Sequence, residues 1–291
     1  MAQLPIVLAH GYLGFGTLGP LNYFNNVASV LKQSGAQEVY ATDVDPKGSL
    51  DDRSSQLAAQ IRHFVPTGKV HLIAHSMGGL DARYLIGKPH GEDLIASLTA
   101  LGSPFQGTFA ADVAADRSKL LQVGAPKLLA ALQQLQVGAV THLPETLPQQ
   151  IRFTVGAFRS ALSGLTTSDY SNAGTYFKGL FSLSDAAVKE LTTEQCLQRF
   201  PADEHDLKGV PSSSYAGLVD SSAASPFLSA SAVVLSAMGQ PNDGIVPVRS
   251  ATLKDHRGTL NNVDHLGLVG WGPTDVSGCY KEIYQRLPNT A

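Results

Sequence analysis

Charged residues and cysteines are both scarce in this sequence. Only 15% of the 291 residues are charged and the formal net charge is −3, whereas about 25% of an average domain is charged. The sequence has no run of lysine and arginine of the kind that binds nucleic-acid phosphates, so we expect no nucleic-acid partner. Two cysteines, Cys196 and Cys279, indicate neither the redox compartment nor whether they pair.

Long apolar runs are also absent, so we expect no membrane span. Residues 221–242 carry no charge, but they are rich in serine and contain two prolines, a composition that does not form a spanning helix. The first residues lack the basic start and apolar stretch of a signal peptide. The sequence is therefore either the mature form of an exported protein or a protein that does not use that route.

Residues 74–78 read AHSMG and have the pattern of a nucleophile elbow. A strand at residues 72–75 that runs directly into a helix at residues 77–86 forces Ser76 into strained backbone angles and exposes its side chain above the sheet. Small neighbours are needed so that strand and helix can pass closely, and Ala74 stands where the pattern usually has its first glycine. The alternative is an ordinary serine that caps a helix.

A glycine-rich motif, HGYLGFG, occupies residues 10–16 after a buried strand predicted at residues 6–9. Acyl transfer creates a negatively charged oxygen, which two backbone N–H groups must stabilise. Met77, directly after the serine, can supply one of them, and the loop at residues 10–12 can supply the other because its glycine lets the backbone approach closely. A glycine-rich turn alone is common, but this order of motifs is not.

In α/β-hydrolases, the fold in which the nucleophile elbow occurs, the catalytic histidine follows the serine and the acid in sequence. Of the nine histidines, His256 and His265 come late enough. His256 lies in a charged, turn-like stretch, whereas His265 lies in a polar loop before an apolar run, so we favour His265. His75 stands beside the nucleophile and cannot turn back onto it, so we interpret it as structural.

Four aspartates can serve as the acid: Asp220, Asp243, Asp255 and Asp264. Asp243 lies in an Asn-Asp-Gly sequence, which is a turn signal in any protein but also suits a loop that carries a buried acid. Asp264 adjoins His265 and is poorly placed to orient its ring. Asp243 is the first choice on these grounds and Asp220 the reserve.

Strand and helix patterns alternate through the first hundred residues and predict an α/β fold with a mostly parallel sheet and flanking helices. The expected elements lie at residues 22–34, 38–42, 51–65, 72–75, 77–86, 98–101, 213–216, 244–248 and 275–287. From about residue 108 to residue 209 the strand rhythm stops. We expect one α/β-hydrolase domain over residues 1–291, with a helical cap or lid inserted at about 108–209.

Within this insertion, apolar side chains recur at helical spacing with few charges around them. They are Leu128, Leu129, Leu132 and Leu135. The pattern predicts an amphipathic helix. It is either a helix that faces the core or a lid that covers an apolar acyl pocket and opens on a lipid surface.

The chain resembles the bacterial true lipases of the Pseudomonas, Burkholderia and Proteus type, an α/β-hydrolase family. The segments that carry the resemblance follow the family order and lie at residues 5–11, 13–15, 75–79, 82–84, 101–108, 191–194, 242–246 and 264–266. The resemblance implies that Ser76, Asp243 and His265 form a catalytic triad. It also implies that Tyr12 and Met77 supply the oxyanion N–H groups.

The function implied by the resemblance is that of a triacylglycerol lipase that acts at an oil–water interface without a cofactor. It favours a secreted protein in mature form over a cytoplasmic one. Two alternatives stay open: a short-chain carboxylesterase without an interfacial lid, and a non-catalytic binding protein on the same fold. The sequence does not show whether a folding helper is needed.

Two departures from the family concern metal and disulfide. Family members carry an aspartate two residues after the catalytic histidine as a ligand of structural calcium, but Gly267 stands there, and Trp271 stands near the place of a later glutamine ligand. Larger members have a cysteine shortly after the catalytic aspartate, whereas no cysteine follows Asp243 before Cys279. We therefore expect no metal, no tightly bound calcium and no such disulfide.

The lid interpretation predicts a substrate-dependent loss in the double variant Leu128→Asp/Leu132→Asp. Each apolar side chain removed from water contributes about 1.5–3 kcal/mol, so hydrolysis of emulsified long-chain ester should fall by more than about tenfold. Hydrolysis of a dissolved short-chain ester should stay near the rate of the wild-type protein. Both rates are measured at equal folded fraction, and an equal loss on both substrates with a lower melting temperature would identify a core helix instead.

Overall fold

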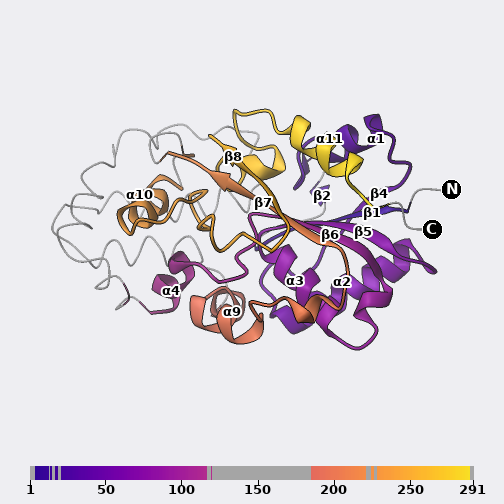
Figure 1. Ribbon diagram of the computed structural model, residues 1–291, viewed down its shortest axis with the longest axis horizontal. Coiled ribbons are helices and arrows are strands. Elements are labelled where there is room, and N and C mark those ends of the chain that lie inside the picture. The colour runs from indigo at the N-terminus through magenta and orange to yellow at the C-terminus, as the bar shows by residue number, and fades with distance from the viewer. Residues whose placement is uncertain are drawn as a thin grey trace.

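The apolar stretches form one parallel sheet in the computed structural model, which describes residues 4–12, 14, 17–18, 21–116, 119, 185–220, 224–225 and 228–288. The sheet has the strand order β4-β1-β5-β6-β7-β8, and every neighbouring pair is parallel (Figure 1). The strands are β1 Ile6–Ala9, β4 Val39–Ala41, β5 Val70–His75, β6 Ile95–Leu101, β7 Ser212–Leu218 and β8 His256–Asn261. The predicted α/β class with a parallel sheet is confirmed.

Helices cover both faces of the sheet. Ile6 and Leu8 pack in a cluster with α1 and α11, whereas Val7 and Ala9 point to the opposite face and pack with α2 and α3, as Figure 1 shows. The α-helices are α1 Val27–Gln33, α2 Leu50–Phe64, α3 Met77–Gly87, α4 Phe109–Ala115, α8 Asp185–Glu190, α9 Thr193–Arg199, α10 Ser229–Ala237 and α11 Ser277–Gln285. Short 3-10 helices lie at Gly91–Asp93, His205–Leu207 and Gly267–Val269.

Two stretches differ from the predicted structure. The helix expected over residues 22–34 begins only at Val27, because Asn26 has a left-handed φ of 60°. The residues before it pair as two short antiparallel strands, β2 Thr17–Leu18 and β3 Leu21–Asn22. The stretch around His256, interpreted as turn-like, is the edge strand β8, because its backbone pairs with β7.

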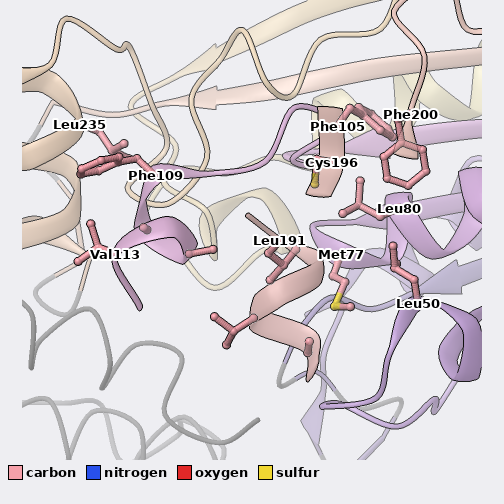
Figure 2. Packing of buried hydrophobic residues seen from close by; sticks show 14 of the residues in the cluster. Leu50, Met77, Leu80, Phe105, Phe109, Val113, Leu191, Cys196, Phe200 and Leu235 are labelled. Atoms are coloured by element: carbon pink, nitrogen blue, oxygen red, sulfur yellow. The ribbon is translucent and has the colours of Figure 1, made fainter. Parts of the chain in front are cut away.

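Three helices of the predicted insertion are described, and they lie beside the elbow. Helices α4, α8 and α9 pack together in an apolar cluster that includes Met77 and Leu80 (Figure 2). The backbone N–H and hydroxyl of Thr193 donate to the carboxylate of Asp112 (2.8 and 2.7 Å), which joins α9 to α4. The four leucines of the predicted lid lie outside the described residues. Among the described helices, none is long and apolar enough to cross a membrane.

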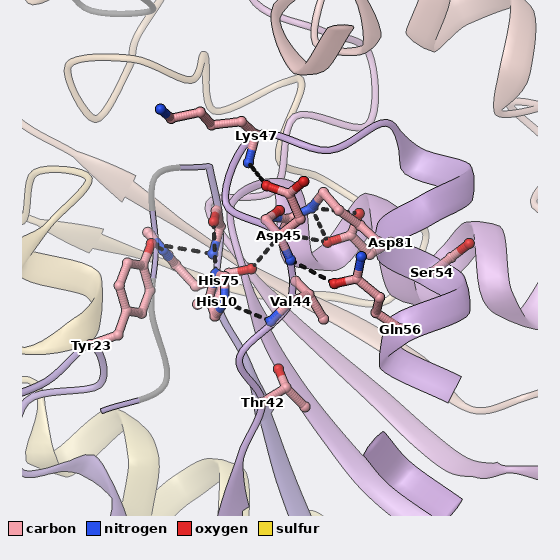
Figure 3. A network of polar contacts seen from close by, with 12 residues as sticks. His10, Tyr23, Thr42, Val44, Asp45, Lys47, Ser54, Gln56, His75 and Asp81 are labelled. Carbon is pink, nitrogen blue, oxygen red and sulfur yellow. Dashed lines mark hydrogen bonds and ion pairs between the residues drawn. The ribbon is translucent and has the colours of Figure 1, made fainter. Parts of the chain in front are cut away.

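A buried ion pair joins α2 to α3 beneath the loop that follows β1. The Arg53 and Asp81 side chains are 0% and 2% exposed, and the guanidinium donates to both carboxylate oxygens at 2.7–3.1 Å. The same guanidinium donates to the carbonyl oxygens of Asp45 (2.7 Å) and His10 (2.9 Å). Figure 3 labels these partners together with Asp81. All three nitrogens of the guanidinium are therefore hydrogen-bonded within the fold.

Replacing Asp81 by asparagine should strongly destabilise the protein. The change leaves the Arg53 charge buried without a counter-charge, and breaking such a pair costs about 3–5 kcal/mol. The free energy of unfolding is measured by urea titration. Arg286→Gln, which removes an exposed ion pair with Glu282, is the control and should leave the midpoint almost unchanged. A loss for Asp81→Asn no larger than that of the control would show that the buried charge is not held by this pair.

Candidate active site

Ser76 sits in a sharp turn between β5 and α3. Its φ is 56° and its ψ is −130°, a combination that non-glycine residues rarely adopt. The neighbours leave no room for larger side chains: a Cβ on Gly78 would lie 2.5 Å from the carbonyl oxygen of Ala9, and a Cβ on Gly79 would lie 2.0 Å from Oγ of Ser103. Ala74, in place of the usual first glycine, is fully buried in the strand.

The structure brings Ser76, His265 and Asp243 together, although 189 residues separate the first two in sequence. Nε2 of His265 lies 2.9 Å from Oγ of Ser76, and Nδ1 lies 2.7 Å from a carboxylate oxygen of Asp243. All three residues are buried, and Ser76 is the most exposed of them at 8%. These are the residues that the sequence favoured as nucleophile, base and acid.

The Asp243 carboxylate is held by the turn that carries it. One oxygen accepts the N–H groups of Ile245 (3.0 Å) and Val246 (2.7 Å), which leaves the other oxygen for the imidazole. Asn242 shapes the turn, because its side-chain oxygen accepts the N–H of Gly244, whose φ of 100° suits glycine. The acid is thus fixed by its own neighbours.

The hydrogen bonds define the tautomer of His265. An ionised carboxylate only accepts, so Nδ1 carries the proton that points to Asp243. Nε2 of the neutral ring then has a lone pair that faces the Ser76 hydroxyl. This arrangement can take a proton from Ser76 without any movement of the ring.

The loop at residues 10–12 passes directly against the nucleophile. A Cβ on Gly11 would lie 2.5 Å from Cβ of Ser76, so only glycine permits this approach. Tyr12 is half-buried and packs on the cluster that contains Met77. The backbone of Gly11 therefore lies against Ser76, with Tyr12 next in sequence after Gly11 and Met77 next after Ser76.

The other candidate residues have different partners. The ring of His256 contacts the hydroxyls of Ser214 (3.0 Å) and Thr259 (3.1 Å) on the sheet, and partial burial lowers its pKa. Asp255 pairs with Arg257 (2.9 Å). Asp220 is exposed. None of these three is hydrogen-bonded to Ser76 or His265 in the described part of the chain.

Two supporting residues carry no motif and were not identified from the sequence. Arg53 holds the His10 carbonyl at the base of the loop, and Tyr23 contacts both Gly11 and His75. The only signal for Arg53 in the sequence is a charged residue on the apolar face of a helix. No local pattern indicates Tyr23. Their contacts follow from the packing of distant segments.

Comparison with known proteins agrees with this geometry. No protein-family model matches the chain. A triacylglycerol lipase of Vibrio cholerae is 30% identical, with 98% of this chain and 88% of that protein aligned. The chain belongs to the bacterial triacylglycerol lipases. A triacylglycerol lipase of Pseudomonas fragi is 32% identical over 56% of this chain and 48% of its own length.

Solved structures show the same fold at low sequence identity. The mature lipase BlEst2 of Bacillus licheniformis superposes with a TM-score of 0.63 over 97% of this chain and 92% of its own, at 17% identity. Lipase 1 of Pelosinus fermentans gives 0.60 over the whole of both chains, at 19% identity. This lipase is therefore a serine carboxylic ester hydrolase on the α/β-hydrolase fold, as predicted.

The residues of this lipase do not fit the family's calcium site. The Asp264 carboxylate accepts the N–H groups of Gly267 (2.8 Å) and Ser225 (2.9 Å) and the Ser225 hydroxyl, so donor hydrogens surround it. A Cβ on Gly267 would lie 3.2 Å from Asp264, which leaves little space for another carboxylate. Among the described residues, no three acidic, histidine or cysteine side chains are grouped to hold a metal.

The two cysteines are both free thiols. Cys196 is buried and its Sγ donates to the carbonyl oxygen of Glu190 (3.2 Å). Burial raises the pKa of each thiol to about 12, so neither is reactive at neutral pH. The pairing that the sequence left open does not occur between these residues.

Chelation should leave this lipase unchanged. Hard cations need several oxygen ligands, and the Asp264 carboxylate already accepts three hydrogen bonds. We expect the same melting temperature and the same rate of ester hydrolysis before and after treatment with EDTA, measured by circular dichroism and a soluble chromogenic ester. A fall in melting temperature that added Ca²⁺ reverses would contradict this.

Proposed function

We propose that the lipase cleaves lipid esters through an acyl-enzyme formed on Ser76. The observation that carries the proposal is the double hydrogen bonding of His265, whose Nε2 faces Ser76 Oγ and whose Nδ1 faces Asp243. Oγ of Ser76 attacks the ester carbonyl while Nε2 takes the hydroxyl proton. The imidazolium then passes this proton to the leaving alcohol.

Asp243 supports both states of the base. Its carboxylate holds the Nδ1–H tautomer before the attack and stabilises the positive ring afterwards. The N–H groups of Met77 and Tyr12 stabilise the negative oxygen of the tetrahedral intermediate. Water, activated by Nε2 of His265, then releases the fatty acid and restores Ser76.

The substrate class supports action at an interface. Triacylglycerols separate from water as oil, so a lipase for them meets its substrate at an oil–water boundary. We therefore also propose that the lipase acts at this boundary and has a helical lid. We further propose that the mature protein is secreted. Comparison of emulsified long-chain ester with dissolved short-chain ester separates this function from that of a short-chain carboxylesterase.

Ser76→Ala and His265→Ala should each lower kcat by at least about 10⁴-fold. Because the residues act as one unit, the double variant should be little worse than either single variant. The rates are measured on a soluble ester, with folding checked by circular dichroism. His256→Ala, in the edge strand β8 that precedes His265, is the matched control and should stay active.

Labelling by an organophosphorus ester provides an independent readout. The unchanged protein and His256→Ala should form one covalent adduct on Ser76, whereas Ser76→Ala should form none. Loss of activity in His256→Ala with full activity in His265→Ala would show that the base is His256 and that its assignment to His265 is wrong. A protein that neither reacts with the label nor hydrolyses esters would be a binding protein on this fold.

A further inference from the structure

A buried chain of polar groups connects two loops of the active site. The N–H of Gly11 points at the Tyr23 hydroxyl, with 3.4 Å between nitrogen and oxygen. That hydroxyl lies 2.7 Å from Nδ1 of His75, and Nε2 of His75 lies 2.9 Å from the backbone carbonyl oxygen of His265. Figure 3 shows Tyr23 and His75 directed at each other beside His10.

The chemistry of its ends gives this chain one direction. A carbonyl oxygen only accepts, so Nε2 of His75 must be the donor to His265. In a neutral ring, Nδ1 is then an acceptor, and the Tyr23 hydroxyl donates its hydrogen bond to it. The Tyr23 oxygen keeps lone pairs that accept the N–H of Gly11. The donor and acceptor roles thus run in one direction, from Gly11 to Tyr23, from Tyr23 to His75 and from His75 to His265.

The His75 ring is held in the neutral state that this direction requires. Burial lowers its pKa well below the usual value, and His265, whose ring centre is 4.5 Å away, lowers it further. His10, which also faces this region, has its pKa lowered to about 3 by burial and by Arg53. The His75 and His10 rings are therefore both held in the neutral state by their surroundings.

Tyr23 is itself anchored to the segment that follows His265. The indole N–H of Trp271 donates to the Tyr23 carbonyl oxygen (2.8 Å). The backbone and side-chain N–H groups of Asn25 donate to the carbonyl oxygens of Val269 (2.9 Å) and Gly270 (2.7 Å). The Tyr23 side chain therefore reaches from the segment that follows His265 to the loop that contains Gly11.

We propose that Tyr23 and His75 are positioning residues that couple the loop at residues 10–12 to the backbone of His265. This inference rests on the proposed roles of Ser76, His265 and the Tyr12 N–H. These hydrogen bonds keep a fixed distance between the Tyr12 N–H, the proposed oxyanion donor, and His265, the proposed base, on the two sides of Ser76. His75 packs against the His265 ring and bonds its backbone carbonyl, so both residues act by holding His265 and Gly11 in place.

The first test removes the Tyr23 hydroxyl. Tyr23→Phe leaves the ring in place but breaks the link between Gly11 and His75, and displacements of about 1 Å at reacting groups cost up to about 100-fold. We expect kcat on a soluble short-chain ester to fall about 10-fold to 100-fold with KM changed by less than about 2-fold. Tyr215→Phe is the control, because Tyr215 is also buried but its hydroxyl bonds Glu282.

The second test removes the ring hydrogen bonds of His75. His75→Phe should lower kcat at least as much as Tyr23→Phe. His71→Phe is its matched control: His71 is a buried histidine on the same strand whose Nδ1 contacts Ser97 (2.7 Å). The control should lose stability but keep kcat at equal folded fraction. The double variant Tyr23→Phe/His75→Phe should have the kcat of His75→Phe, because both changes break one chain.

The outcomes separate this inference from the proposed function. If Ser76→Ala is inactive while Tyr23→Phe and His75→Phe have the kcat of the wild-type protein, the inference fails and the proposed triad stands. If the two variants lose kcat only in proportion to a loss that the controls share, the residues are merely structural and the inference also fails. If Ser76→Ala hydrolyses esters, the proposed function itself is wrong.

Discussion

The sharp turn at Ser76, where β5 runs directly into α3, is the constraint on which the active site depends. Ser76 keeps its strained φ of 56° only because the surrounding segments leave it no alternative. Gly11, Gly78 and Gly79 each bring neighbouring atoms closer than a Cβ would allow. Strain of this kind costs about 1–3 kcal/mol. The fully buried strand β5, which leads into the turn, and the fully buried strand β6, which pairs with it, offset this cost. The core of the sheet thus offsets the strain that positions the Ser76 hydroxyl.

The parallel sheet explains how distant residues meet at this turn. Ser76 follows β5, Asp243 lies in the segment after β7, and His265 follows β8. The carboxyl ends of parallel strands share one edge of the sheet, so loops that follow different strands converge there. The backbone secures the convergence, because the N–H of His265 donates to the carbonyl oxygen of Asp243 (2.8 Å). The acid and the base therefore hold each other by both main chain and side chain.

Features that depend on local sequence were predictable, and features that depend on pairing were not. The elbow, the strands β1, β5 and β6 and the helix α2 follow from residues adjacent in sequence. In contrast, the start of α1 is set by Asn26, and β8 is a strand because β7 lies beside it. The three residues of the candidate site could be named from motif order, but Tyr23 could not, since its contacts join residues 52 positions apart.

His265 shows why the surroundings matter as much as the triad. Its two ring nitrogens face Ser76 and Asp243, its N–H donates to the Asp243 carbonyl, and its own carbonyl accepts from His75. All four of its polar groups are therefore held, and Asp264 ties the next turn of the loop to Gly267 and Ser225. A base fixed in this way can accept and return a proton with almost no reorganisation, which is the condition under which preorganised electrostatics lowers a barrier. In this lipase that condition is met by hydrogen bonds of the protein's own groups.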